Sequence, residues 1–289
     1  MPDIVNYAAW LCVSLYSEDR LVALTTLENI LPIVYGLNMH ITSLPQIASI
    51  YLEFGNDQFA KSIVPDLLYN IRFMLANANR DESMLGLYIF YTLNTIGLLE
   101  DLDEYDDAVE AYLDAIAPYI DRLNEANAGE YYMNTKAIDY LMVACYYSNI
   151  AQYNTAKEYV ERALSILDDA PLSRRERQEW ELRRRWTEYE IAYGSGDYAT
   201  AVESFIECIP GFETYVLTPD VDTYAKIAYA ASCISDYATM KMAAEQHVDG
   251  IRSHITSTMF NLGDSARAMY WDKWSDSSNL IIDAYCNTS

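Results

Sequence analysis

A short motif that recurs along the chain constrains the fold more than any other feature of the sequence. Its clearest copy spans residues 193–205 and reads Tyr-Gly-Ser-Gly-Asp-Tyr-Ala-Thr-Ala-Val-Glu-Ser-Phe. A tyrosine ends one helix, a Gly-Asp turn follows, and Tyr198 opens the next helix, because glycine accepts the positive φ that commonly ends helices. Ala201 and Phe205 then share one helix face. The motif predicts two helices joined by a tight turn, with a small residue at their closest approach.

Weaker copies of the motif lie on both sides of this one. They cover residues 147–160, 235–240 with Ala244 after them, 103–112, 51–60 and 16–23. The positions that correspond to the small residue are Ala23, Ala60, Ala108, Ala156, Ala201 and Met240, at intervals of 37, 48, 48, 45 and 39 residues. Repetition at such a period is typical of a solenoid in which each helix pair packs on its neighbours.

The motif resembles the tetratricopeptide repeat, and its best copies cover residues 131–250. The resemblance implies an all-α, right-handed superhelix of about six helix pairs, in which the first helix of each pair lines a concave groove. The intervals exceed the usual repeat length of about 34 residues, so we expect longer helices or longer connections here.

The copies also place the helices. We expect the pairs 3–16 with 18–37, 41–54 with 57–77, 82–99 with 104–125, 131–149 with 153–168, 174–193 with 197–209, and 220–234 with 237–256. Proline lacks the backbone N–H that a helix interior uses, so Pro65 predicts a break near Val64. For the same reason we expect Pro32, Pro118 and Pro210 to kink or end the second helix of their pairs.

The last residues differ from the repeats. We expect a repeat domain over residues 1–260 and a C-terminal capping helix within 261–289, amphipathic from Ala266 to Tyr285. The segment Met269-Tyr-Trp-Asp-Lys-Trp-Ser is weakly similar to the stretch that follows the repeats in CHAT proteins, which are caspase-like peptidases with repeat arrays. That family's peptidase domain has no counterpart in this sequence.

The chain is strongly acidic, with a formal net charge of −24 over 289 residues. Such a field repels nucleic acid phosphates and anionic membranes, so neither is an expected partner. No uninterrupted apolar stretch reaches the ~18 residues of a membrane span. The five cysteines are scattered and form no CxxC pair, which favours a reducing compartment, and we expect a cytoplasmic protein.

Motifs for catalysis or cofactor binding are missing from the sequence. It contains no GxxxxGK[ST], GxGxxG or GxSxG element. His247 and His254 are seven residues apart and share a helix face, but they lie two turns apart instead of one. We therefore expect no catalytic residues, no metal and no cofactor.

The candidate binding residues lie mainly in one arginine-rich segment. Residues 174–185 hold six of the 19 basic residues, namely Arg174, Arg175, Arg177, Arg183, Arg184 and Arg185, with Trp180 and Trp186 interleaved. Arginine forks onto carboxylates and stacks on rings, so an acidic peptide or a C-terminal carboxylate is one expected ligand. The alternative is pairing within the chain, with Glu176, Glu179, Glu181 and Glu188 and with acidic residues of neighbouring repeats. Tyrosine suits binding surfaces and occurs 26 times. Tyr140, Tyr147, Tyr153, Tyr198 and Tyr237 fit core positions of the repeat, whereas Tyr229 does not and is a candidate contact.

These observations leave three hypotheses for the function. The first is a non-catalytic scaffold that binds a protein or peptide in the groove through Arg183, Arg184, Arg185, Trp180, Trp186 and Tyr229. The second is a regulator that changes shape on binding a signal peptide, similar to the repeat halves of Gram-positive peptide-sensing regulators. The third is an enzyme or the regulatory half of one, such as the repeat half of a larger CHAT-type peptidase. The partner's identity and the oligomeric state stay open.

Overall fold

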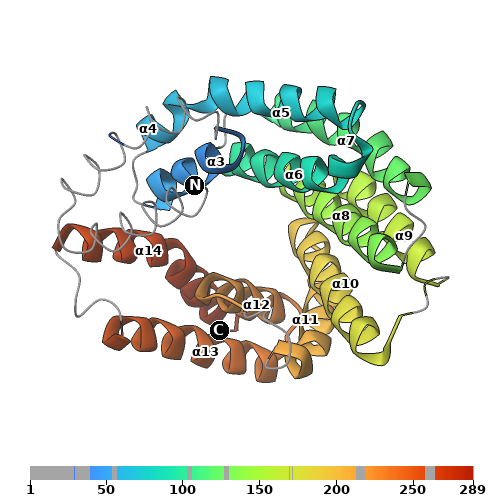
Figure 1. The fold of residues 1–289 in the computed structure, drawn as a ribbon. Coiled ribbons are helices and arrows are strands. Elements are labelled where there is room, and N and C mark those ends of the chain that lie inside the picture. The colour runs from blue at the N-terminus through green and yellow to red at the C-terminus, as the bar shows by residue number, and fades with distance from the viewer. Residues whose placement is uncertain are drawn as a thin grey trace. The chain divides into compact units, whose positions relative to one another are not determined.

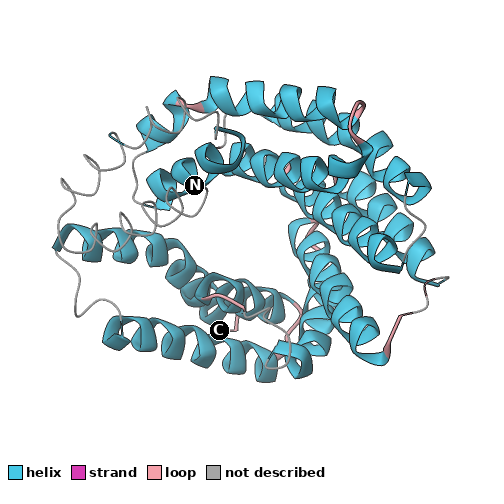
Figure 2. Cartoon of the chain, viewed as in Figure 1, coloured by secondary structure: helices cyan, strands magenta, loops and turns pink. Residues whose placement is uncertain are grey.

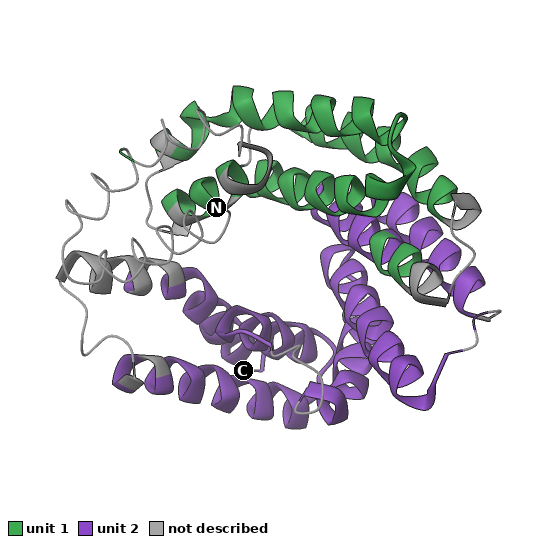
Figure 3. Cartoon of the chain, in the orientation of Figure 1, with its two compact units in different colours: residues 1–139, 261–269 green, residues 140–260, 270–289 purple. Residues whose placement is uncertain are grey.

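The computed structural model is built from α-helices packed in succession (Figures 1 and 2). It describes residues 29, 40–53, 57–102, 106–126, 130–168, 170, 172–212, 219–257 and 264–288, and no strand occurs among them. The chain divides into two compact units, which Figure 3 distinguishes by colour. The all-α helical-repeat class expected from the sequence is thereby confirmed. The expected first pair, over 3–16 and 18–37, lies outside the described helices.

Unit 1 comprises Met1–Asp139 and Asn261–Met269. Its helices are α3 (His40–Glu53), α4 (Asp57–Ser62), α5 (Val64–Ala78), the 3-10 turn η1 (Glu82–Met84), α6 (Leu85–Asp101), α7 (Asp106–Ala126) and the first half of α8 (Glu130–Asn149). Helix α6 packs against α3, α5 and α7. Polar contacts join α5 to α7, since Arg72 Nε donates to the Tyr112 hydroxyl at 3.1 Å.

One proline of this unit stands at a helix break, as the sequence predicts, and another lies inside a helix. The helix breaks between Ser62 and Val64, with Pro65 in the first turn of α5, where a missing N–H costs nothing. In contrast, α7 runs on through Pro118 to Ala126. In the second unit, helix α11 (Tyr198–Phe212) ends shortly after Pro210, and Pro32 lies outside the described residues.

Unit 2 comprises Tyr140–Phe260 and Tyr270–Ser289. It holds the second half of α8, then α9 (Tyr153–Asp168), α10 (Arg174–Gly194), α11 (Tyr198–Phe212), α12 (Val221–Cys233), α13 (Tyr237–Ser257) and α14 (Asp264–Cys286) from Tyr270 onward. The pairs α10–α11 and α12–α13 have the most extensive contacts, and α11 packs on α12. This chain of contacts is the succession of helix pairs that the motif predicts.

The three connections that carry the motif in unit 2 have the same backbone geometry. Each contains one residue of positive φ two positions before the tyrosine: Ala151 (60°), Gly196 (79°) and Ser235 (62°). In each, the next amide donates to a carbonyl five residues back, from Gln152 to Tyr147, from Asp197 to Ala192 and from Asp236 to Ala231, at 2.8, 2.8 and 2.9 Å. This is the Schellman ending of a helix, which uses one left-handed residue. The repeat in the sequence is therefore a repeat in structure.

Most small residues of the motif lie at buried helix contacts, as predicted. Ala60, Ala156 and Ala201 are fully buried, and Met240 is nearly so. Ala108 is an exception, because it is half-buried and the adjacent Val109 takes the core position. Ala23 lies outside the described residues.

The tyrosine that opens each second helix contacts the next pair. The Tyr153 ring lies against Gly194 of α10, where an added Cβ would be 2.8 Å from the ring. The Tyr198 ring lies 5.7 Å from that of Tyr229 on α12. Tyr237 was expected in the core, but its side chain is 52% exposed. Among the described residues, no further helix–turn–helix pair of the motif packs over this ring as α10 packs on Tyr153 and α12 on Tyr198.

Helix α14 is continuous over the residues expected for the capping helix. Its C-terminal part covers the core of the last pairs, because Ala284 is fully buried in that core and Ile281 packs against it. Helix α14 is divided between the two compact units after Met269, and the expected domain boundary at residue 260 stays a prediction. No helix in the described part of the chain combines the length and the apolar character that crossing a membrane requires.

Candidate binding surface

The arginine-rich segment folds as helix α10, and its start has a local cause. The Ser173 hydroxyl accepts from the Glu176 amide at 3.3 Å, and the Glu176 carboxylate accepts from the Ser173 amide at 2.8 Å. This reciprocal capping box satisfies two amides that would otherwise lack partners at the helix end. It also holds the pKa of Glu176 below its usual value.

The three consecutive arginines of α10 are ion-paired within the chain. Arg183 pairs with Glu179 at 3.1 Å, and Arg184 pairs with both Glu181 and Glu188. Hydrogen bonding from Arg184 is the main reason that the pKa of Glu181 falls below its usual value. These are the i,i+3 and i,i+4 pairings that helices support.

Arg185 differs from the other two because it also reaches the next helix. Its Nε atom lies 3.2 Å from Glu181 and 2.6 Å from Glu207 on α11, and its Nη1 atom lies 3.3 Å from Glu188. Arg185 therefore joins the two helices of one pair through charge-assisted contacts.

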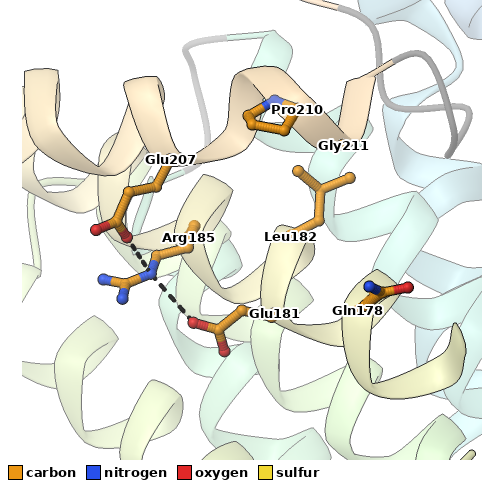
Figure 4. A pocket seen from close by; sticks show the side chains of 7 residues that line it. All are labelled: Gln178, Glu181, Leu182, Arg185, Glu207, Pro210 and Gly211. Carbon is orange, nitrogen blue, oxygen red and sulfur yellow. Dashed lines mark hydrogen bonds and ion pairs between the residues drawn. The ribbon is translucent and has the colours of Figure 1, made fainter. Parts of the chain in front are cut away.

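A shallow pocket of about 310 Å³ opens beside Arg185, between α10 and the end of α11 (Figure 4). Its lining consists of Gln178, Glu181, Leu182, Arg185, Glu207, Pro210 and Gly211. Gly211 allows the close approach of the two helices, since an added Cβ would lie 3.0 Å from a methyl carbon of Leu182.

The surface around the arginines is not positive once their partners are counted. Three guanidinium groups, Arg183–Arg185, face four carboxylates, Glu179, Glu181, Glu188 and Glu207, so the formal sum is 3 − 4 = −1. An acidic ligand at this place would have to displace carboxylates that are already bound. Three of the glutamates named by the pairing alternative, Glu179, Glu181 and Glu188, pair with these arginines, whereas Glu176 caps the helix.

The two tryptophans of α10 point into the protein. Trp180 is only 2% exposed, so it offers no open ring face. Trp186 is half-buried, and its ring lies 5.4 Å from Tyr189 and 5.9 Å from Phe212. Both rings contribute mainly to packing beneath α10.

Tyr229 lies apart from the arginines, on α12. Its half-buried ring continues a row of tyrosines, with Tyr198 at 5.7 Å and Tyr193 a further 5.9 Å from Tyr198. Burial raises the pKa of Tyr193 to about 12. The pKa of Tyr229 is also raised, mainly by the nearby Cys233 thiol and next by Tyr198. These phenols therefore stay protonated at neutral pH and can donate hydrogen bonds.

Charged groups surround this row. Lys226 of α12 places its Nζ atom 5.9 Å from the centre of the Tyr193 ring. Glu190 of α10 has its pKa raised by burial, and Lys226 counteracts that rise. Asp283 of α14 acts electrostatically on Tyr229, and nearby the Asn287 amide donates to the Ser232 hydroxyl at 3.3 Å. We call Glu190, Tyr193, Tyr198, Lys226, Tyr229 and Asp283 the tyrosine face.

Of the tyrosine face, only Tyr229 was singled out as a ligand contact from the sequence. The signal for the others is helical spacing, because 190 and 193 on α10, and 226 and 229 on α12, are three apart and share a face. Tyr198 contacts both Tyr193 and Tyr229 because α10, α11 and α12 pack together, and the sequence does not show this packing.

The described histidine side chain has a structural contact. His247 is buried, and its Nδ1 atom lies 2.9 Å from the Val221 carbonyl oxygen, which accepts the hydrogen bond. Within the described ranges, no three side chains of His, Cys, Asp or Glu come together as metal ligands. The side chains of His40 and His254 lie outside the described part.

Comparison with known proteins adds no relative. No protein-family model, curated protein or solved structure matches this chain.

Proposed function

We propose that this chain is a non-catalytic scaffold that binds a protein or peptide on the surface of its helix pairs. The observation that carries the proposal is the tyrosine face, where rings from three helices of successive pairs form one connected, partly exposed row. Tyrosine gives large contact area with few rotatable bonds, which is why it is enriched in binding surfaces.

We propose further that the helix pairs are tetratricopeptide-like repeats. The three identical turns and the buried Ala156 and Ala201 support this assignment. Under it, α10 and α12 are the first helices of their pairs and present the binding surface.

We place the protein in a reducing compartment, the cytoplasm. Cys208, Cys233 and Cys286, which lie in described helices, are free thiols. Buried Cys208 acts as a small core residue there.

Affinity capture with variants tests the proposal. The immobilised protein is compared with a Tyr193→Ala/Tyr229→Ala variant and with a Tyr69→Ala control, in which an exposed ring of unit 1 is removed. Mass spectrometry should find a partner that the wild type and control retain and the double variant loses, with a Kd at least tenfold weaker by calorimetry. Equal capture by the double variant, folded by circular dichroism, would contradict this choice of surface.

A further inference from the structure

The tyrosine face combines aromatic rings with an excess of negative charge. Asp220 and Asp283 bring two formal negative charges against the one positive charge of Lys226, while burial disfavours the charged form of Glu190. The whole chain carries −24. A cation approaching this face therefore gains from the local groups and from the long-range field.

A cation already rests on the face. The Lys226 ammonium lies over the Tyr193 ring at 5.9 Å, which is within the range of cation–π attraction. No carboxylate of the described residues lies within 4.0 Å of it, although closer ion pairs form elsewhere in unit 2. Lys226 is exposed and has a flexible stem, so it can swing away when another cation arrives.

We propose that the tyrosine face binds a lysine or arginine side chain from a basic segment of a partner protein, in competition with Lys226. This proposal rests on the proposed function and adds the chemistry of the partner. The incoming cation would stack on Tyr193 and Tyr229 while the carboxylates of Glu190 and Asp283 balance its charge.

Charge complementarity selects this occupant over the alternatives. An acidic peptide would meet Glu190 and Asp283 with only Lys226 to attract it. A second copy of the chain would bring another −24 against the same surface. A basic segment meets neither obstacle.

The role of Lys226 gives a test in which the two ligand charges predict opposite results. The probes are short Gly-Ser peptides with acetylated and amidated ends, one carrying arginines and one carrying glutamates, followed by fluorescence anisotropy. Lys226→Gln removes the competing cation, so the arginine peptide should bind about three- to tenfold more tightly. Asp283→Asn should weaken the affinity for the same peptide by a similar factor.

Matched controls separate the local effect from total charge. Lys241→Gln and Asp249→Asn make the same charge changes on exposed positions of α13. They should shift the affinity less than twofold, because both side chains are strongly exposed and already paired on α13, and exposed charges act weakly through water. Tyr229→Leu should weaken binding of the arginine peptide, whereas Tyr229→Phe should retain most of that binding.

Three results would overturn the inference: tighter binding of the glutamate peptide, weaker binding of the arginine peptide to Lys226→Gln, or equal effects of Lys226→Gln and Lys241→Gln. If the arginine peptide fails while a captured partner still depends on Tyr193 and Tyr229, the inference fails and the proposed function stands. If the arginine peptide behaves as expected but no partner depends on those tyrosines, the proposed function fails.

Discussion

The Nε atom of Arg185 on α10 lies 2.6 Å from a carboxylate oxygen of Glu207 on α11, and this contact joins the two helices of one repeat. Arg185→Gln leaves Glu181, Glu188 and Glu207 close together with one cation fewer. We expect a loss of about 0.5–1 kcal/mol in the free energy of unfolding, since these groups are partly exposed. Arg177→Gln, at an exposed position of the same helix, should change it little. Urea denaturation of both variants measures the difference, and equal losses would mean that the contact with Glu207 adds no stability.

Arg184 should control the titration of Glu181. Its hydrogen bond holds the pKa of Glu181 below the usual value, so Arg184→Gln should raise that pKa. A depressed carboxyl pKa stabilises the fold above the unfolded pKa, and this stabilisation is lost as pH falls through the folded pKa. The variant should therefore be destabilised more at pH 7 than near pH 3. Carbon-detected NMR titration of the Glu181 carboxyl checks the shift, and an unchanged pKa would contradict the pairing.

Buried Asp139 should give the opposite pH dependence. Burial raises its pKa to about 8 from 3.8, so the folded protein holds a proton that the unfolded chain releases between these values. The contribution of this group to stability is complete below about pH 4 and declines as pH rises towards 8, by ~1.4 kcal/mol per pH unit. Asp139→Asn should remove this decline, so the variant should gain stability relative to the wild type as pH rises from 5 to 8. Denaturation curves over that range test it, and a constant difference would show that Asp139 titrates normally.

At the positive-φ positions of these turns, introducing a glycine and removing one should change the stability of the fold in opposite directions. Ser235→Gly should stabilise the protein by about 0.5–1 kcal/mol, because a left-handed backbone is strained for residues with a Cβ. Gly196→Ala should destabilise it by about 1 kcal/mol, although its Cβ would meet no neighbouring atom. Thermal unfolding of both variants gives the signs, and the same sign for both would contradict a shared turn geometry.

Ala201 tests the repeat packing. It is fully buried, whereas Ala199 on the same helix is exposed. Ala201→Leu should overpack the helix contact and cost ~1–3 kcal/mol, and Ala199→Leu should cost little. If chemical denaturation finds the two variants equally stable, the repeat register assigned to Ala201 is wrong.

Much of the fold is readable from the sequence, because the repeated turn marks where each helix ends. The pair α10–α11 follows from Gly196 and Asp197, and the break before Pro65 follows from the missing N–H of proline. The exposure of Tyr237 could not be read in this way, because it depends on which helices pack beside α13. A motif copy looks the same in sequence whether or not another pair covers it.

The candidate site was harder to predict than the fold. A run of arginines indicates positive charge, but its effect depends on partners such as Glu207, which lies on another helix. Lys226 belongs to no sequence motif, and its role at the candidate site depends on the nearby ring of Tyr193. Such relationships between helices arise from packing, so they appear only with the structure.

Hydrogen exchange with and without a captured partner tests the central claim, that the tyrosine face is the binding surface. Binding there should slow amide exchange, because it both covers these helices and suppresses their local opening. The account predicts added protection in residues 186–194 of α10 and 222–233 of α12, with little change in α5 and α6 of unit 1. Protection confined to unit 1, or no protection in α10 and α12 at saturating partner, would contradict it.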